Sequence, residues 1–223
     1  MKSLTGKGFL SVIILIFILS VIGCAAINKA GDERVRLKEP RIKPLPAPEW
    51  TAEQQKILNP LKGKDGSVLN LYPTLVRHPK MAEKFFTFAS YILRENTLPP
   101  REREILILRI GWLCQSEYEF GQHTLVGKTV GLTSEEIFRI TQGPNAAEWD
   151  PFDAMLIRAA DELHSDAFIS DATWNALAQR YSEQQLMDLI MTVGDYTMVS
   201  MYLNTIGVQL EKGKVGFPKG KDK

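Results

Sequence analysis

The chain has 223 residues, with 27 Lys and Arg against 26 Asp and Glu, so its formal net charge is +1. This balance gives no basic surface of the kind that binds nucleic acid, and we expect no nucleic-acid partner. Two cysteines are too few for a disulfide scaffold or a four-thiolate zinc site, and three histidines leave little room for a His-rich metal centre. Length and an apolar content of 44% suit one globular domain with short additional segments.

Residues 1–23 are predicted to form a lipoprotein signal peptide. Two lysines precede an apolar run over Phe9–Ile22, which is shorter than the roughly 20 residues that a membrane-spanning helix needs. The run ends in Val21, Ile22, Gly23 and Cys24, which resembles a bacterial lipobox. The resemblance implies cleavage before Cys24, lipidation of its thiol, attachment to a membrane and a periplasmic or outer-face location in the cell envelope. An uncleaved signal anchor is the alternative.

The segments on either side of the predicted domain have the composition of unpacked chain. Residues 24–48 contain four prolines between positions 40 and 48, interleaved with Arg and Lys, which favours an extended tether. Residues 212–223 are rich in Gly and Lys and are expected to be a disordered tail. The domain itself is then expected over residues 49–211.

Helix signals follow one another through that domain, and no segment has the alternation of a strand. Four pairs have the spacing of a capping box, namely Thr51/Gln54, Ser116/Glu119, Thr133/Glu136 and Ser182/Gln185. Prolines at positions 79, 100 and 151 can each open a helix, and Ser170 or Asp171 can cap another. We therefore expect an all-α fold of about seven to eight helices. The helix from Pro100 is apolar on nearly all sides, which predicts that it is buried.

The clearest candidate for chemistry is the pair Glu119 and His123, spaced i and i+4 on one helix, so that their side chains can meet. A carboxylate beside an imidazole fixes its tautomer and raises its pKa, which suits acid–base catalysis. Glu104 flanks the apolar helix, where an acid is costly unless it is paired or functional. From spacing alone, an ordinary surface pair remains the alternative for Glu119 and His123.

Other residues have two open interpretations. Arg109 can pair with a buried carboxylate or bind a substrate carboxylate, and Tyr118 can line a pocket or pack in the core. Cys114 reads most simply as a small buried residue, and His164 as a helix-end cap.

Four motifs in this region resemble the carboxymuconolactone decarboxylase family, which shares its fold with AhpD-like alkylhydroperoxidase partners. They are PPRERE over residues 99–104, LRIG over 108–111, SEYEFGQH over 116–123 and GLTSEEI over 131–137. The resemblance covers roughly residues 80–145. It implies an AhpD-like helical fold and a homo-oligomer, a trimer or hexamer, with the helices at 183–210 and 104–113 as possible interfaces.

Within that resemblance, Glu104 and His123 match the acid and the histidine of the redox branch. Ser116 and Glu119 stand where that branch has its Cys-x-x-Cys pair, and a Ser/Glu pair cannot cycle between dithiol and disulfide. The resemblance therefore points to the decarboxylase branch, with Glu104, Glu119 and His123 as catalytic residues and Ser116, Tyr118 and Arg109 in the substrate pocket.

We thus expect a carboxy-lyase-like enzyme that needs no metal and no cofactor and moves a proton on a small organic acid or lactone, in a decarboxylation or an isomerisation. In this expectation His123 carries the proton and the two glutamates position it. The alternatives are a thiol-dependent peroxidase or oxidoreductase, which would depend on Cys114, and a non-catalytic ligand-binding lipoprotein of the envelope.

Overall fold

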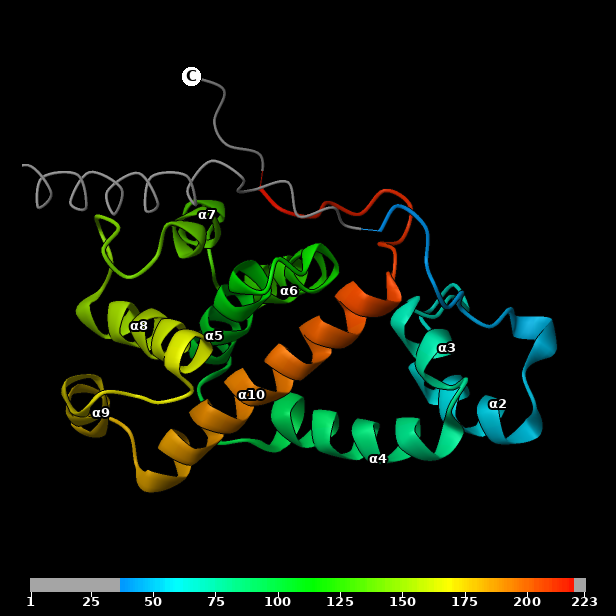
Figure 1. Cartoon of the computed structure of the whole chain (residues 1–223), viewed down its shortest axis with the longest axis horizontal. Coiled ribbons are helices and arrows are strands. Elements are labelled where there is room, and N and C mark those ends of the chain that lie inside the picture. The colour runs from blue at the N-terminus through cyan, green and yellow to red at the C-terminus, as the bar shows by residue number, and fades with distance from the viewer. Residues whose placement is uncertain (1–36, 219–223) are drawn as a thin grey trace, which may run out of the picture. The chain divides into compact units, whose positions relative to one another are not determined.

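The computed structural model describes residues 37–218, and within this range the chain is helical and contains no strand (Figure 1). The α-helices are α2 (Ala52–Leu58), α3 (Leu71–Leu75), α4 (Pro79–Ser90), α5 (Pro100–Leu113), α6 (Glu117–Thr129), α7 (Ser134–Gln142), α8 (Pro151–Asp166), α9 (Asp171–Ala178) and α10 (Glu183–Ile206). Two short 3₁₀ turns, η1 (Ala47–Glu49) and η2 (Asn59–Leu61), and one π-helical turn, η3 (Tyr91–Glu95), complete them. The all-α prediction is confirmed.

Local signals placed most of these helices correctly. The capping boxes at Thr51, Thr133 and Ser182 are present with both of their hydrogen bonds. Proline occupies the first turn of α4, α5 and α8, as expected. All eight expected helices occur, and α3 is an addition. It was missed because it has five residues and contains Pro73, so it shows neither an apolar period nor a start signal.

Helix α5 lies at the centre of the domain, where α6, α7, α8 and α10 contact it. Its residues Ile105–Ile110 are all buried, and in Figure 1 the long helix α10 crosses this part of the domain diagonally. The predicted burial of the helix is confirmed. Because residues 104–111 are buried within the chain, this part of α5 offers no surface for an interface between subunits, contrary to the suggestion for residues 104–113.

Residues 37–48 do not form a free spacer, and this part of the predicted tether is wrong. They contain two bends and the start of η1, and the backbone NH of Arg41 donates to the Ile206 carbonyl at 2.8 Å. The backbone NH of Leu45 donates to the Pro73 carbonyl at 3.0 Å. Proline-rich composition predicted a segment without α-helix, but it carried no information about the carbonyl groups that this backbone would meet.

The described part of the predicted disordered tail also packs on the domain. Phe217 lies with its ring centroid 5.1 Å from that of Trp112 and 5.4 Å from that of Phe120. One aromatic side chain in a segment of Gly and Lys therefore anchors residues 212–218, because burying a large ring outweighs the weak local preferences of its neighbours.

The predicted signal peptide and Cys24 lie outside the described residues. Within residues 37–218, no helix combines the length and the hydropathy that a membrane span requires.

Candidate active site

Three buried side chains from two helices form the centre of the site. His123 of α6 lies between two glutamates: its Nδ1 is 2.6 Å from Oε2 of Glu104 on α5, and its Nε2 is 3.0 Å from Oε1 of Glu119. Glu104 is 0% exposed, Glu119 4% and His123 8%. The structure thus brings together the three residues that the sequence singled out, and the surface-pair alternative for Glu119 and His123 does not hold.

The close approach of α5 and α6 makes this geometry possible. A Cβ atom at Gly111 would lie 3.4 Å from the backbone nitrogen of Phe120, so it would already be in van der Waals contact and would leave no room for a side chain longer than that of Ala. Arg103 supports Glu104 from the same helix, with Nε 3.8 Å from Oε1. Glu104 is therefore held between two cationic groups, which offsets the cost of burying its charge.

The predicted capping box at the start of α6 is absent. Ser116 is the N-cap residue, but its side chain makes no capping hydrogen bond. Glu119 turns its carboxylate to His123 instead of back to the first turn. The ion pair with an imidazolium is stronger than a bond to one backbone amide, so the tertiary contact replaced the local one.

His123 is a cation at neutral pH. Burial lowers the pKa of its imidazole, but the charges of Glu104 and Glu119 outweigh burial and raise it to about 10. Both ring nitrogens face carboxylate oxygens, so both carry a proton that they donate. The ring also packs edge-on against Tyr196 of α10, with centroids 4.9 Å apart. Its orientation is fixed on three sides.

A cavity of about 400 Å³ opens beside this triad. Its walls are largely apolar and come from α3, α4, η3, α6 and α10; they include Leu71, Phe85, Phe86, Leu93, Val126 and Val199. Glu119 and His123 line it, together with the polar side chains Tyr72, Arg94, Tyr118, Gln122 and Asp195. Apolar walls with a few convergent polar groups are typical of a small-molecule site.

Of the three residues expected in the substrate pocket, only Tyr118 lines the cavity. Its hydroxyl donates to Glu211 at 3.0 Å and accepts from the backbone NH of Leu71 at 3.3 Å. Burial, and then the charge of Glu211, raise its pKa. Tyr118 therefore forms a fixed part of the wall.

Arg109 and Ser116 do not line the cavity, which corrects their assignment to the pocket. Arg109 forms a two-pronged ion pair with Asp161 of α8, at 2.6 and 3.1 Å, and its Nη1 donates to the carbonyl of Ile140. Of the two interpretations of Arg109, pairing with a buried carboxylate is therefore the correct one. Ser116 is fully buried at the helix start. Sequence spacing does not specify which side of a buried helix faces a cavity.

Two residues of the cavity were missed by sequence analysis. Arg94 lies in the π-helical turn η3, and its guanidinium makes no hydrogen bond or ion pair with the residues described. Asp195 lies within α10 and is 5% exposed. A π-helical turn often marks a functional position, but nothing in the sequence announced this one.

Cys114 is not among the residues that line the cavity. Its Sγ lies 3.8 Å from Nδ1 of His164 on α8. In the part of the chain that the structure covers, no group of three or more His, Cys, Asp or Glu residues is arranged to hold a metal ion.

Comparison with known protein families finds a match for the central segment of the chain. Residues 79–151 match the profile of the carboxymuconolactone decarboxylase family. Comparison with curated protein sequences gives no match.

Solved structures with the same fold cover nearly the whole domain at low identity. An AhpD-core, peroxidase-related protein from Ralstonia eutropha JMP134 is 18% identical, with a TM-score of 0.67 over 77% of this chain and 93% of its own. A peroxidase-related protein from Silicibacter sp. TM1040 is 14% identical, with a TM-score of 0.67 over 79% and 95%. The debrominase Bmp8 in complex with 2,3,4-tribromopyrrole is 13% identical, with a TM-score of 0.62 over 78% and 94%. Residues 79–151 thus resemble the carboxymuconolactone decarboxylase family, within a helical domain whose fold is similar to that of the AhpD-core structure.

Proposed function

We propose that this protein is a carboxymuconolactone decarboxylase-like enzyme that catalyses decarboxylation or isomerisation of a small organic acid or lactone. The observation that carries the proposal is the imidazolium of His123 held between Glu104 and Glu119 at the wall of the 400 Å³ cavity. A buried charged triad of this kind is costly in a structural core, and it is common where a proton must be moved.

The roles within the triad differ from the sequence-based expectation. A group whose pKa is raised to about 10 is already protonated at neutral pH, so His123 is a poor proton acceptor. Glu119 lines the cavity, and its Oε2 receives no hydrogen bond from the described residues. We assign to Glu119 the abstraction of a proton from carbon in an isomerisation. A decarboxylation takes no proton from carbon, and there the role of Glu119 is to orient the His123 imidazolium at the cavity wall. His123 orients this carboxylate, and Glu104 keeps His123 charged.

Arg94 supports an anionic substrate. It takes the place that the sequence assigned to Arg109, because it lines the cavity and its guanidinium is available. An arginine binds a carboxylate through two parallel hydrogen bonds, which orients the bound molecule as well as attracting it. The apolar walls would hold the rest of a small acid or lactone.

The direct test is to incubate the purified full-length protein with carboxylated lactones and β-keto acids and to measure turnover as the release of CO₂. Benzoylacetate, an aryl β-keto acid, belongs in this panel. We expect activity in the wild type and a loss of about 100-fold or more in Glu119→Gln and His123→Ala. Glu135→Gln, an exposed carboxylate of α7, is the matched control and should keep wild-type activity. Full activity in both triad variants would overturn the assignment.

The second candidate is a thiol-dependent reaction, favoured by the peroxidase-related names of proteins with this fold and by the Cys114–His164 contact. It predicts oxidation of Cys114 by peroxide and a loss of that activity in Cys114→Ala. Activity of Cys114→Ala equal to that of the wild type would exclude it. A non-catalytic ligand-binding lipoprotein, the third possibility, predicts ligand binding that survives Glu119→Gln without turnover.

We also propose that the mature protein is attached to a membrane of the cell envelope through lipid on Cys24. This proposal rests on the lipobox-like residues 21–24. Metabolic labelling with radioactive palmitate should label the wild type and leave Cys24→Ser unlabelled. Equal labelling of both would overturn it.

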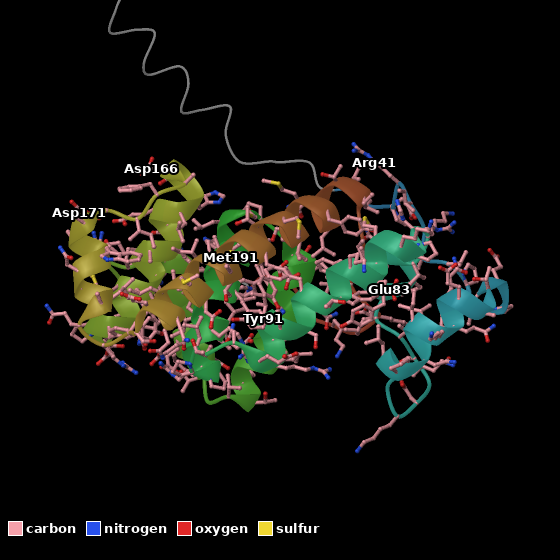
Figure 2. The ribbon with its side chains drawn as sticks, turned by 90° about the horizontal axis from the view of Figure 1, so that it is seen from below. Arg41, Glu83, Tyr91, Asp166, Asp171 and Met191 are labelled. Atoms are coloured by element: carbon pink, nitrogen blue, oxygen red, sulfur yellow. The ribbon has the colours of Figure 1, made fainter. Side chains whose placement is uncertain are left out.

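A homo-oligomer, a trimer or hexamer, remains our proposal for assembly, with α10 as its interface. Exposed side chains on this helix are Met187, Met191, Met198 and Met201. Figure 2 shows Met191 of α10 and Tyr91 of η3 on the face seen in that view. Light scattering measures the mass of the particle in solution. We expect a smaller mass for a variant with Met191 and Met198 changed to Glu than for the wild type, and an unchanged mass would exclude α10 as the interface.

A further inference from the structure

Asp195 is an exception among the buried carboxylates of α10. It lines the cavity and is 5% exposed, yet its Oδ1 has no hydrogen-bond partner among the residues described. Asp188, two turns earlier on the same helix, is equally buried but receives hydrogen bonds from the hydroxyls of Tyr91 and Thr97. An ionised carboxylate left unpaired in an apolar site is strongly unfavourable, so Asp195 tends to hold a proton.

The charges around Asp195 favour the protonated form as well. From α6 it faces Glu119, and the ring of the adjacent Tyr196 packs against His123. From α5, the charges of Glu104 and Arg103 act on Tyr196. From η3, Arg94 lines the same cavity. Burial, and then the negative charge of Glu119, raise the pKa of Asp195 to about 6.

The cations near Asp195 do not cancel this effect. The charge of His123 is shared between its two glutamate partners, and Arg103 lies against Glu104. Arg94 is the remaining cation of the cavity among the residues described, and an anionic substrate would occupy it. Binding of such a substrate also displaces water, which strengthens the preference of Asp195 for its proton.

Two carboxyl groups of one cavity thus have opposite environments. The carboxylate of Glu119 contacts the His123 imidazolium at 3.0 Å, whereas Oδ1 of Asp195 has no hydrogen-bond partner among the residues described and the group faces another acid. Environments that separate two titratable groups in this way indicate one base and one acid. We propose that Asp195 is a catalytic residue that donates the proton to the substrate carbon, opposite Glu119. This inference rests on the proposed function.

The proton transfer balances in both reactions. In a decarboxylation, the bond to the substrate carboxylate breaks, its electron pair moves into the conjugated carbonyl group, and CO₂ leaves. The carbon then takes the proton of Asp195, and water reprotonates the carboxylate after product release, so one proton is consumed per turnover. In an isomerisation, Glu119 takes a proton from one carbon while Asp195 gives one to another, and solvent exchange restores both carboxyl groups.

The tyrosines of the cavity are poorer candidates for this step. Tyr118 already donates its proton to Glu211. Tyr196 packs its ring against His123, and burial raises its pKa further above the ordinary value. Asp195 is the acidic group whose protonation changes near neutral pH, as a proton donor in repeated turnover requires.

The test combines titration with kinetics on the full-length protein. Carbon-13 NMR of protein labelled at the Asp carboxyl groups should show one aspartate with a midpoint near 6, and this signal should be absent in Asp195→Asn. With benzoylacetate as the probe, Asp195→Asn should lower kcat by about 100-fold, with KM changed by less than about threefold. The rate of the wild type should fall above pH 6 as Asp195 loses its proton, and this fall should be absent in Asp195→Asn. Asp195→Glu should restore part of the rate.

The matched control is Asp188→Asn, a buried carboxylate of the same helix outside the cavity, which should keep the wild-type rate and pH profile. Wild-type turnover by Asp195→Asn, with Glu119→Gln inactive, would overturn the role of Asp195 and leave the proposed function intact. A midpoint below about 5 for Asp195 would overturn it as well. Absence of any acceleration by the wild type would instead refute the proposed function for this substrate class, and the donation step with it.

Discussion

Nδ1 of His123 lies 2.6 Å from Oε2 of Glu104, a residue 19 positions earlier on the neighbouring helix α5. This contact joins the two helices at the site, and it leaves Nε2 of the ring for Glu119. Glu119, the partner that the sequence predicted for His123, is therefore one of two carboxylates that contact the ring, and Glu104 is the other. Of these two carboxylates, the charge of the His123 ring depends most on Glu104, the one from α5.

Glu104→Gln should show this dependence. The substitution leaves His123 with one carboxylate, so the pKa of its imidazole should fall from about 10 toward its ordinary value. Breaking a buried ion pair should also lower the free energy of unfolding by about 3 kcal/mol. Nitrogen-15 NMR titration of the histidine and urea unfolding measure the two effects. A wild-type midpoint in Glu104→Gln would mean that Glu119 alone sets the charge of the ring.

The stability contributed by the triad should depend on pH in one direction. The pKa of His123 is raised above 6.5 in the folded state, so the folded protein binds more protons than the unfolded chain between pH 6.5 and about 10. The stabilisation is fully present below pH 6.5 and is lost as the pH rises through about 10. Urea unfolding of wild type and His123→Asn at pH 6, 8 and 10 tests this. The difference between the two proteins should shrink toward pH 10.

The ionisation of Asp195 should lower the stability of the fold, whereas the protonation of His123 raises it. Its pKa is raised from 3.8 to about 6, so the ionised group destabilises the fold, and stability falls as the pH rises through this window. Asp195→Asn removes the cost and should raise the free energy of unfolding at pH 7 by up to about 3 kcal/mol. Asp188→Asn keeps one acceptor oxygen in place of two, so it loses the hydrogen bonds from either Tyr91 or Thr97 and should destabilise instead. Equal destabilisation by both substitutions would contradict the unpaired state of Asp195.

Arg94→Met should weaken the binding of a small carboxylate such as benzoylacetate by about 10-fold or more, because the cavity would lose the guanidinium available to an anion. The effect should appear mainly in KM. Arg77→Met is the control, since the Arg77 side chain donates to the Lys43 carbonyl away from the cavity. If both variants keep the wild-type KM, the substrate does not use Arg94.

Phe217→Ala should destabilise the domain by about 1–2 kcal/mol, because a half-buried ring loses its contacts with Trp112 and Phe120. Val215→Ala, at an exposed position of the same segment, should change stability by less than about 0.5 kcal/mol. Thermal unfolding of the two variants distinguishes a packed C-terminal segment from a loose one. Equal melting temperatures would indicate the latter.

Sequence analysis predicted best what local forces decide. Capping boxes and prolines at first turns depend on residues within one helical turn, so the helix starts at Ala52, Pro79 and Glu183 were readable. The exception is Ser116, where the predicted partner Glu119 had a stronger partner in space. Local rules fail where a tertiary contact outweighs them.

The sequence by itself determined that the chain is helical, that α5 is buried and that Glu119 and His123 share a helix face, because these features depend on periodicities of a few residues. Only the tertiary structure decided which charged groups enter the cavity. It brought Arg94 and Asp195 there and turned Arg109 toward Asp161 instead. The reason is that helix packing sets the rotation of each helix about its own axis, and that rotation depends on the whole core rather than on neighbours along the chain.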